Sequence, residues 1–270
     1  KVFKICLFFC VLFTVEIIKI KFLKMEIIVV TGKTKTEELR VTRAIGALGI
    51  SMTQPFSALS NETITAYIER ADGNNTEILN NISLKAFMAG SVSEAPAIFQ
   101  NADGCSALCE ICENGSVVLQ ETESIRIKLE NLKSGVSYEL HGIEYPQYSS
   151  ETVQWSRKNL LVGETDRKLS VASEELAVIE NPDGITELSV SYENGLTVKY
   201  TRKELDFLSR DLDPVKIVDQ DSTTLKGRTQ YDFPGLLNFP LVGVSSLDVK
   251  KISDSAVIIY LKNDSQSYQA

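Results

Sequence analysis

The sequence is poor in the residues that carry out chemistry. It holds a single histidine, His141, and a single tryptophan among 270 residues. It contains no glycine-rich phosphate loop, no His-Glu-x-x-His motif and no Gly-x-Ser-x-Gly motif. Catalysis by histidine needs a partner within hydrogen-bond reach, and the residues around His141 suggest none. These absences point away from an enzyme, so we assign no catalytic, cofactor-binding or metal-binding residue.

Acidic residues outnumber basic ones, 36 against 28. The formal net charge is −8 at pH 7, and the lysines and arginines are scattered along the chain. Binding to phosphate backbones needs clustered Lys and Arg, so we expect no sequence-specific binding of nucleic acid. One local group stands near the N-terminus and is interpreted as part of a solvated arm: Lys33, Lys35, Arg40 and Arg43.

Long apolar runs are missing except at the beginning of the sequence. The run from Ile5 to Val15 is too short to cross a membrane, since a spanning helix needs about 20 apolar residues. Three interpretations of residues 1–24 stay open: an upstream extension with Met25 as the true start, a signal or anchor peptide, or a genuine structural segment. Under the first interpretation, the mature protein begins at Met25 and has 246 residues.

Five cysteines form no regular disulfide framework, and three of them lie close together. Cys105, Cys109 and Cys112 have the spacing of radical SAM cluster sites, but the alternation of strands and long helices typical of those enzymes is lacking. With His141, the three thiolates could complete a tetrahedral zinc site. The simplest interpretation is three small, partly buried thiols in a reducing compartment.

Two further groups of side chains allow a functional and a plain interpretation. Acidic residues could bind Ca²⁺ at an interface, although solvated loop acids are the simpler interpretation. A Phe-rich stretch could be a contact patch, but we interpret it as core. The acids are Glu174, Glu175, Asp211, Asp213, Asp219 and Asp221, and the stretch holds Phe233, Leu236, Leu237 and Phe239.

The same local pattern occurs twice, once in each half of the chain. Each copy is an alternating strand, a turn ending in glycine, a short returning strand and a short helix opened by Ser83 or Thr201. The turns at Asp72-Gly73 and Asn194-Gly195 supply the positive φ values that tight hairpins need. Ser and Thr are good helix N-caps. The strands that close each half also correspond, residues 125–132 with 244–252 and residues 138–145 with 256–261.

These patterns predict an all-β fold. Short strands separated by turns, with almost no long helical pattern, are typical of sandwiches and barrels. The repeat is too long for a solenoid and so predicts two similar domains. We expect two tandem eight-stranded jelly rolls, each with a short helix after a β-hairpin. The predicted domains are an apolar segment over 1–24, an N-terminal arm over 25–44, a first jelly roll over 45–150 and a second over 151–270.

Other elements are predicted from local patterns. Asn181-Pro-Asp-Gly184 is a strong turn signal. Residues 90–102 are expected to be irregular, and residues 219–231 are expected to form a long polar loop. Strands are predicted at residues 26–30, 116–119, 168–171 and 176–179.

The repeated unit resembles the halves of small double jelly-roll major capsid proteins. These belong to icosahedral phages with an internal membrane, of the corticovirus-like and lipid-containing flavobacterial types in the adenovirus-related lineage. The resemblance covers residues 61–88 and 185–208 best. It implies a structural virion protein whose homotrimers have a pseudo-sixfold outline and tile an icosahedral shell over the membrane, after assembly in the host cytoplasm.

The resemblance also implies partners and no cofactor. The partners are neighbouring capsomers, minor capsid proteins and membrane proteins. The arm from Lys33 to Arg43 is expected to contact either the lipid headgroups of the viral membrane or a neighbouring capsomer. It implies no role for Cys105, Cys109 and Cys112. Two alternatives remain: a secreted or cell-surface β-sandwich module such as an adhesin or carbohydrate binder, which requires a working signal peptide in residues 1–24, and a β-rich enzyme or metal protein that uses the cysteines.

Overall fold

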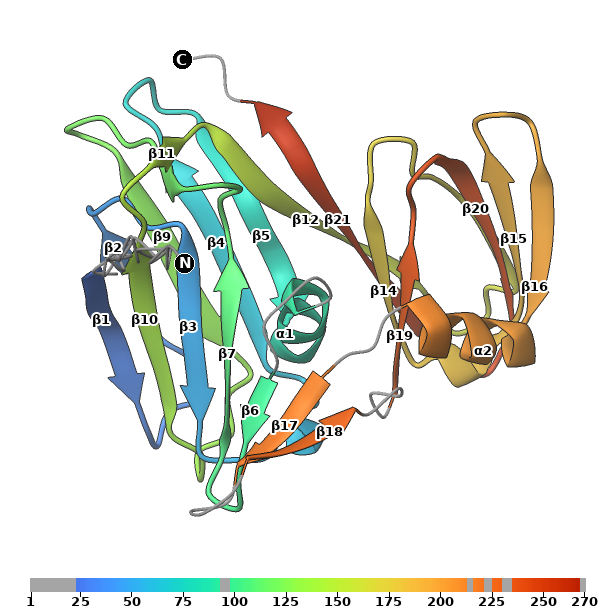
Figure 1. The fold of residues 1–270 in the computed structure, drawn as a ribbon, viewed down its shortest axis with the longest axis horizontal. Helices are drawn as coiled ribbons and strands as arrows, with labels where there is room; N and C mark the ends of the chain where they lie inside the picture. Colours follow the sequence, from blue (N-terminus) through green and yellow to red (C-terminus); the bar gives the residue numbers. More distant parts are fainter. Residues whose placement is uncertain (1–22, 93–97, 213–215, 221–224, 230–234, 268–270) are drawn as a thin grey trace, which may run out of the picture.

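The computed structural model describes residues 23–92, 98–212, 216–220, 225–229 and 235–267, which form β-strands and two short α-helices (Figure 1). The predictions made for residues 1–22 lie outside this described part. Within it, neither helix has the length or the apolar character to cross a membrane.

The first half of the chain forms two facing antiparallel sheets. Alternate residues such as Ile64, Ala66 and Ile68 are fully buried between the sheets, which explains the alternating sequence pattern. In order across the first sheet, the strands are β1 (Leu23–Val30), β10 (Tyr138–Glu144), β3 (Ala47–Met52) and β7 (Cys105–Glu110). In order across the second, they are β2 (Leu39–Val41), β9 (Ser124–Glu130), β4 (Thr63–Glu69) and β5 (Asn75–Ser83).

The second half repeats this arrangement strand for strand. Each strand has a counterpart with the same place in the chain order and the same neighbours, so the predicted pair of eight-stranded barrels is confirmed. One sheet holds β12 (Glu151–Leu160), β21 (Val257–Ser267), β14 (Leu176–Glu180) and β19 (Leu236–Pro240). The other holds β13 (Asp166–Ser170), β20 (Val244–Lys251), β15 (Ile185–Tyr192) and β16 (Thr197–Thr201).

The predicted hairpin and helix units are also confirmed. Helix α1 (Leu84–Ser91) follows the β4–β5 hairpin, and helix α2 (Arg202–Leu212) follows the β15–β16 hairpin. Gly73 and Gly195 have φ values of 83° and 84° in the two turns. The Asn181–Gly184 turn forms a 3₁₀ helix, Pro182–Gly184. The glycines in the turns and the Ser or Thr residues that cap the helices therefore account for these hairpins and helices.

The N-terminal arm expected over residues 25–44 is not what the structure shows. Strand β1 pairs with β10, and β2 pairs with β9, so both strands belong to the first barrel. Val30 and Val41 are 4% and 3% exposed, and the Thr36 N–H donates to the Leu129 carbonyl at 2.9 Å. Two buried valines and long-range pairing hold this segment in the barrel.

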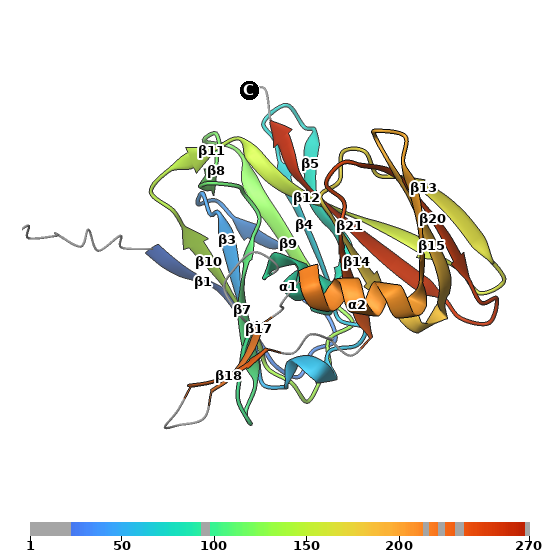
Figure 2. The ribbon, with the colours of Figure 1, turned by 45° about the vertical axis from the view of Figure 1, so that its right-hand side comes forward.

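The polar loop expected over residues 219–231 is wrong in part. Strands β17 (Lys216–Gln220) and β18 (Leu225–Thr229) form a hairpin, and β17 pairs in parallel with β6 (Ile98–Gln100) in the stretch expected to be irregular. Both views place this hairpin at the edge of the first barrel (Figures 1 and 2). The side chain of Ile217 is 3% exposed and packs in the first core, which holds the hairpin there.

The two barrels share one continuous sheet and a common packing layer. Strands β5 and β12 pair in parallel through Leu79 and Trp155. Along β14, Val178 faces the core that includes the first barrel, while Ala177 and Ile179 face the core of the second. Strand β12 begins at Glu151, and the predicted division of the chain between residues 150 and 151 stays a prediction. A short parallel pair, β8 (Ser116–Val117) with β11 (Tyr148–Ser149), completes the described strands.

Candidate functional sites

The three clustered cysteines lie in or beside β7 and are free and buried. Cys109 pairs with Leu48, which pairs with Gly142, so its side chain points inward. His141 lies one residue away on β10 and therefore points to the other face of the sheet. The zinc alternative thus fails on geometry, and within the described residues His, Cys, Asp and Glu form no group that could hold a metal ion.

Most of the acidic residues considered for calcium lie where side chains are not described, namely Asp211, Asp213, Asp219 and Asp221. Burial raises the pKa of Glu174, which opposes the ionised form that a hard cation needs. In the Phe-rich stretch, Leu236, Leu237 and Phe239 are buried in β19, as predicted for core, and Phe233 lies outside the described residues.

The basic residues near the N-terminus lie on the surface of the first barrel. Lys33, Lys35, Arg40 and Arg43 are all exposed. Arg43 donates to Glu144 at 2.5 Å, which ties this segment to the end of β10. The basic side chains therefore project from barrel strands and their connections.

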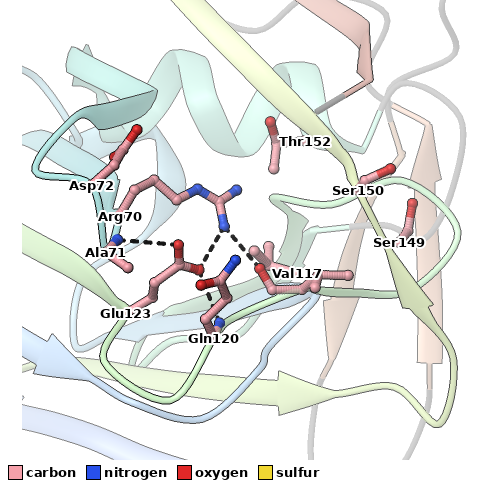
Figure 3. Close-up of a pocket in the computed structure, with 10 residues that line it drawn as sticks. Arg70, Ala71, Asp72, Val117, Gln120, Glu123, Ser149, Ser150 and Thr152 are labelled. Carbon is pink, nitrogen blue, oxygen red and sulfur yellow. Dashed lines mark hydrogen bonds and ion pairs between the residues drawn. The ribbon is translucent and has the colours of Figure 1, made fainter. Parts of the chain in front are cut away.

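A pocket of about 390 Å³ opens among three loops at one end of the first barrel (Figure 3). Arg70, at the end of β4, lies 2.9 Å from Glu123, which precedes β9, and it also donates to the Val118 carbonyl at 3.0 Å. The side chains of Arg70 and Glu123 are 12% and 4% exposed. The remaining walls come from residues 149–152, between the first and second barrels in sequence.

Neighbouring groups of the protein fix the charge state of Glu123 in this pocket. Burial acts to raise the pKa of Glu123, but the backbone N–H groups of Gln120 and Ala71 and the Arg70 guanidinium outweigh it and lower the pKa. Glu123 is therefore an ionised carboxylate that accepts hydrogen bonds from Arg70, Ala71 and Gln120. Its main role is to join the hairpin loop to the β8–β9 loop. Sequence patterns missed this pair because Arg70 and Glu123 are far apart in the chain.

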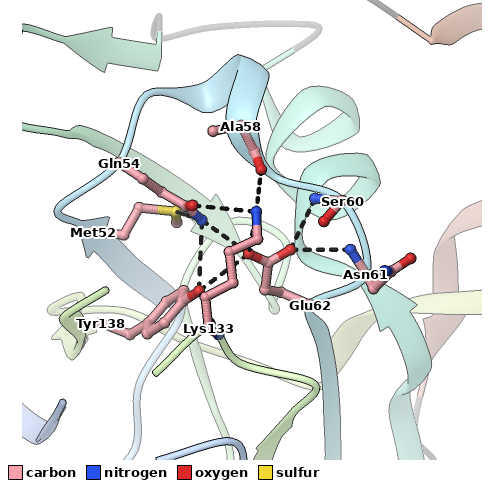
Figure 4. A network of polar contacts seen from close by, with 8 residues as sticks. All are labelled: Met52, Gln54, Ala58, Ser60, Asn61, Glu62, Lys133 and Tyr138. Atoms are coloured by element: carbon pink, nitrogen blue, oxygen red, sulfur yellow. Dashed lines mark hydrogen bonds and ion pairs between the residues drawn. The ribbon is translucent and has the colours of Figure 1, made fainter. Parts of the chain in front are cut away.

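A second polar network lies at the other end of β4, around the buried Glu62 (Figure 4). Glu62 is 1% exposed, and its carboxylate accepts hydrogen bonds from the backbone N–H groups of Ser60 and Asn61 at 2.8 and 3.0 Å. It also accepts from the side chains of Gln54 at 2.9 Å and Tyr138 at 3.1 Å. The network fastens the loop before β4 to the beginning of β10.

The network around Glu62 also sets the charge state of its members. Burial acts to raise the pKa of Glu62, but the Ser60 N–H, the Gln54 amide and the charge of Lys133 lower it overall. The Lys133 ammonium stands 3.3 Å from the carboxylate. Burial first, and then the charge of Glu62, raise the pKa of Tyr138 to about 12. Glu62 is thus an ionised carboxylate whose hydrogen bonds and ion pair are made within the protein.

Buried apolar and polar side chains also lie together where the two barrels meet. Helix α1 lies between the barrels in both views (Figures 1 and 2), and its Phe87 ring meets Trp155 of β12 edge to face at 5.9 Å. Lys85 is 9% exposed; burial lowers its pKa, while the charges of Glu180 and Glu62 act in the opposite direction. Tyr260 of β21 donates to Glu180 at 2.8 Å. Apolar packing and buried polar groups therefore occur together at this junction.

Comparison with known proteins gives a likeness of fold. No protein-family model matches the chain, and no curated protein sequence matches it. The chain is similar to the major capsid protein P2 from bacteriophage PM2, with a TM-score of 0.51 and 9% identity over 89% of this chain and 95% of that one. It is also similar to PBCV-1 VP54, fitted into a reconstruction of the virophage Sputnik, with a TM-score of 0.46 and 8% identity over 90% and 92%. The likeness to P2 spans both barrels, and the predicted resemblance is confirmed at the level of the fold.

Proposed function

We propose that this chain is the major capsid protein of an icosahedral virus, a structural protein that is not an enzyme. The observation that carries the proposal is the duplicated eight-stranded barrel, which matches a major capsid protein along nearly the whole of both chains. The buried polar groups support it as well, since Glu62 and Glu123 are both used to hold loops in place. In this proposal the protein resides in the virion shell.

We propose further that three chains form a homotrimer with a pseudo-sixfold outline, and that trimers tile a shell over an internal membrane. Two barrels per chain give six similar barrels per trimer, and a near-sixfold tile packs efficiently with its neighbours. Minor capsid and membrane proteins would then be further partners, with assembly in the host cytoplasm.

A contact between the basic residues near the N-terminus and the membrane is part of the same proposal. Lys33 and Lys35 are exposed and available to anionic lipid headgroups. Deleting this segment would remove strands β1 and β2, so charge reversal is the better test. We expect the pair Lys33→Glu and Lys35→Glu to reduce binding to vesicles of anionic phospholipid while assembly is kept; unchanged binding would exclude this contact.

Electron microscopy and native mass measurement of the purified protein test the capsid proposal. We expect a stable trimer, and shells or flat arrays of trimers at high protein concentration. A monomer that never assembles and that binds immobilised glycans would instead support the adhesin or carbohydrate-binding alternative.

A further inference from the structure

The two helices occupy equivalent places in the two repeats. The Ser83 side chain accepts a hydrogen bond from the Ala86 N–H at 3.4 Å, and Thr201 accepts one from the Glu204 N–H, also at 3.4 Å. Each helix follows the returning strand of its hairpin. Aligning the two N-caps places Lys85 opposite Lys203 and Ala89 opposite Phe207.

In the first repeat, the helix is completely buried between its own barrel and the second barrel. Every residue from Leu84 to Gly90 is buried. A Cβ atom built on Gly90 would lie 3.0 Å from Val178 and 2.3 Å from Trp155, both in the sheet of the second barrel. The helix therefore packs directly against the outer face of the sheet β12–β21–β14–β19.

In the second repeat, only part of the equivalent helix surface is open. Leu205 and Leu208, the counterparts of Phe87 and Gly90, pack against their own barrel. Lys203 and Phe207, the counterparts of Lys85 and Ala89, are exposed, Phe207 by 57%. Helix α2 lies along the outside of the second barrel (Figure 2). Phe207 is thus a large apolar side chain left exposed on a helix whose counterpart is fully covered.

The first barrel has the complementary open surface. Its sheet β1–β10–β3–β7 is the counterpart of the sheet that α1 covers in the second barrel. Along β3 the residues alternate between buried and partly exposed, while β14 is buried on both faces. One row across the outer face joins Val29, Glu139, Ser51, Ser106 and Phe99 by direct register. Val29 and Phe99 are 48% and 39% exposed.

We propose that α2 of one chain docks on this outer face of the first barrel in a second copy, repeating between chains the contact that α1 makes within the chain. Charge supports the pairing: the charge of Glu180 acts favourably on Lys85 inside the chain, and the exposed Lys203 would meet Glu139, whose side chain is 46% exposed. The two patches differ, so the contact is head to tail and forms a ring when its rotation closes. This inference rests on the proposed capsid function, because it identifies the subunit contact of the capsomer.

Replacing the exposed Phe207 of α2 with a charged residue tests the contact. We expect Phe207→Glu to weaken self-association about tenfold or more, as for a buried aromatic at an interface, measured by light scattering and native mass. Val242→Glu is the matched control, because Val242 is 81% exposed in the turn between β19 and β20 and lies outside both patches. Unchanged urea unfolding of both variants would show that folding is intact.

Cross-linking gives a second measurement that does not depend on tight association. One preparation carries Phe207→Cys and the other carries Glu139→Cys. When the two are mixed under mild oxidation, we expect a disulfide to form between the two copies. We expect no such disulfide when the mixture is first unfolded in urea. A wild-type trimer that is unaffected by Phe207→Glu and gives no cross-link overturns this contact and leaves the capsid proposal standing. Cross-linked trimers that never form shells would support the contact and overturn the capsid proposal. A wild-type chain that stays monomeric and gives no cross-link overturns both.

Discussion

Gly90 in helix α1 lies against the indole ring of Trp155 in strand β12, so closely that a Cβ atom at position 90 would stand 2.3 Å from the ring. Trp155 is 2% exposed and cannot move aside without disturbing the junction of the barrels. The helix and the second barrel can approach this closely only because residue 90 has no side chain.

The first prediction concerns this close approach. We expect Gly90→Ala to lower the free energy of unfolding by about 1–3 kcal/mol, the usual cost of overpacking a filled interior. Gly135→Ala is the control, since a Cβ atom there meets nothing within 4 Å. Urea unfolding followed by the fluorescence of the single tryptophan measures both; equal stability of the two variants would contradict the packing described for α1.

The second prediction concerns Glu62 and pH. Because its pKa in the folded protein is below the ordinary value of 4.5, ionised Glu62 stabilises the fold above pH 4.5, and this contribution is lost as the pH falls through the lowered pKa. We expect Glu62→Gln to cost about 1–3 kcal/mol at neutral pH, as for hydrogen bonds to a charged group, and the difference from wild type to shrink in acid.

Urea unfolding of both proteins, from neutral pH down through pH 4.5, checks this expectation. The exposed Glu121→Gln is the matched control, with little effect at any pH. A loss from Glu62→Gln that stays constant in acid would mean that the ionised carboxylate is not the stabilising form.

The third prediction compares a buried ion pair with an exposed one. Removing Arg70 leaves Glu123 charged and 4% exposed, so we expect Arg70→Met to cost about 3 kcal/mol. Arg126, paired with the half-exposed Glu69 at 2.7 Å, should cost about 1 kcal/mol or less when replaced by Met. Adding Glu123→Gln to Arg70→Met should restore part of the loss, and similar losses from the two arginine variants would argue against a structural role for the pocket pair.

The fourth prediction concerns cysteine reactivity. Burial raises the pKa of Cys105 and of Cys109 to about 12, and of Cys112 to about 11. Since the thiolate is the reactive form, we expect alkylation of these three thiols to be slow in the folded protein and fast in urea. Peptide mass mapping separates them from Cys6 and Cys10. Rapid alkylation of Cys109 under native conditions would show that the first barrel opens readily.

The sequence predicted the hairpins well because their determinants are local. Gly73 and Gly195 supply the positive φ of each turn, and Ser83 and Thr201 cap each helix, whatever lies elsewhere in the chain. The zinc alternative failed for the opposite reason. The spacing of the cysteines said nothing about which face of the sheet His141 would occupy, and strand register alone placed it on the other face.

The misjudged segments share a physical cause. The strand predicted at residues 26–30 lies within β1, but the barrel that β1 joins depends on its pairing with β10, far away in the sequence. Strands β2 and β17 are short, with two apolar residues each, and also pair with distant strands. A local pattern does not contain these partners, so an arm and a loop were expected in their places. The networks of Glu62 and Arg70 were missed likewise, because each joins loops that only the folded barrel brings together.

The sequence by itself determined the duplication: alternation, turn glycines and helix caps act over a few residues and recur in both halves. Only the tertiary structure decided how the halves differ. Helices α1 and α2 are each capped by a hydroxyl side chain, Ser83 or Thr201. Helix α1 is nevertheless buried, whereas α2 carries the exposed Phe207. Burial depends on what packs against a helix face, and within one chain the second barrel covers α1 while α2 stays open.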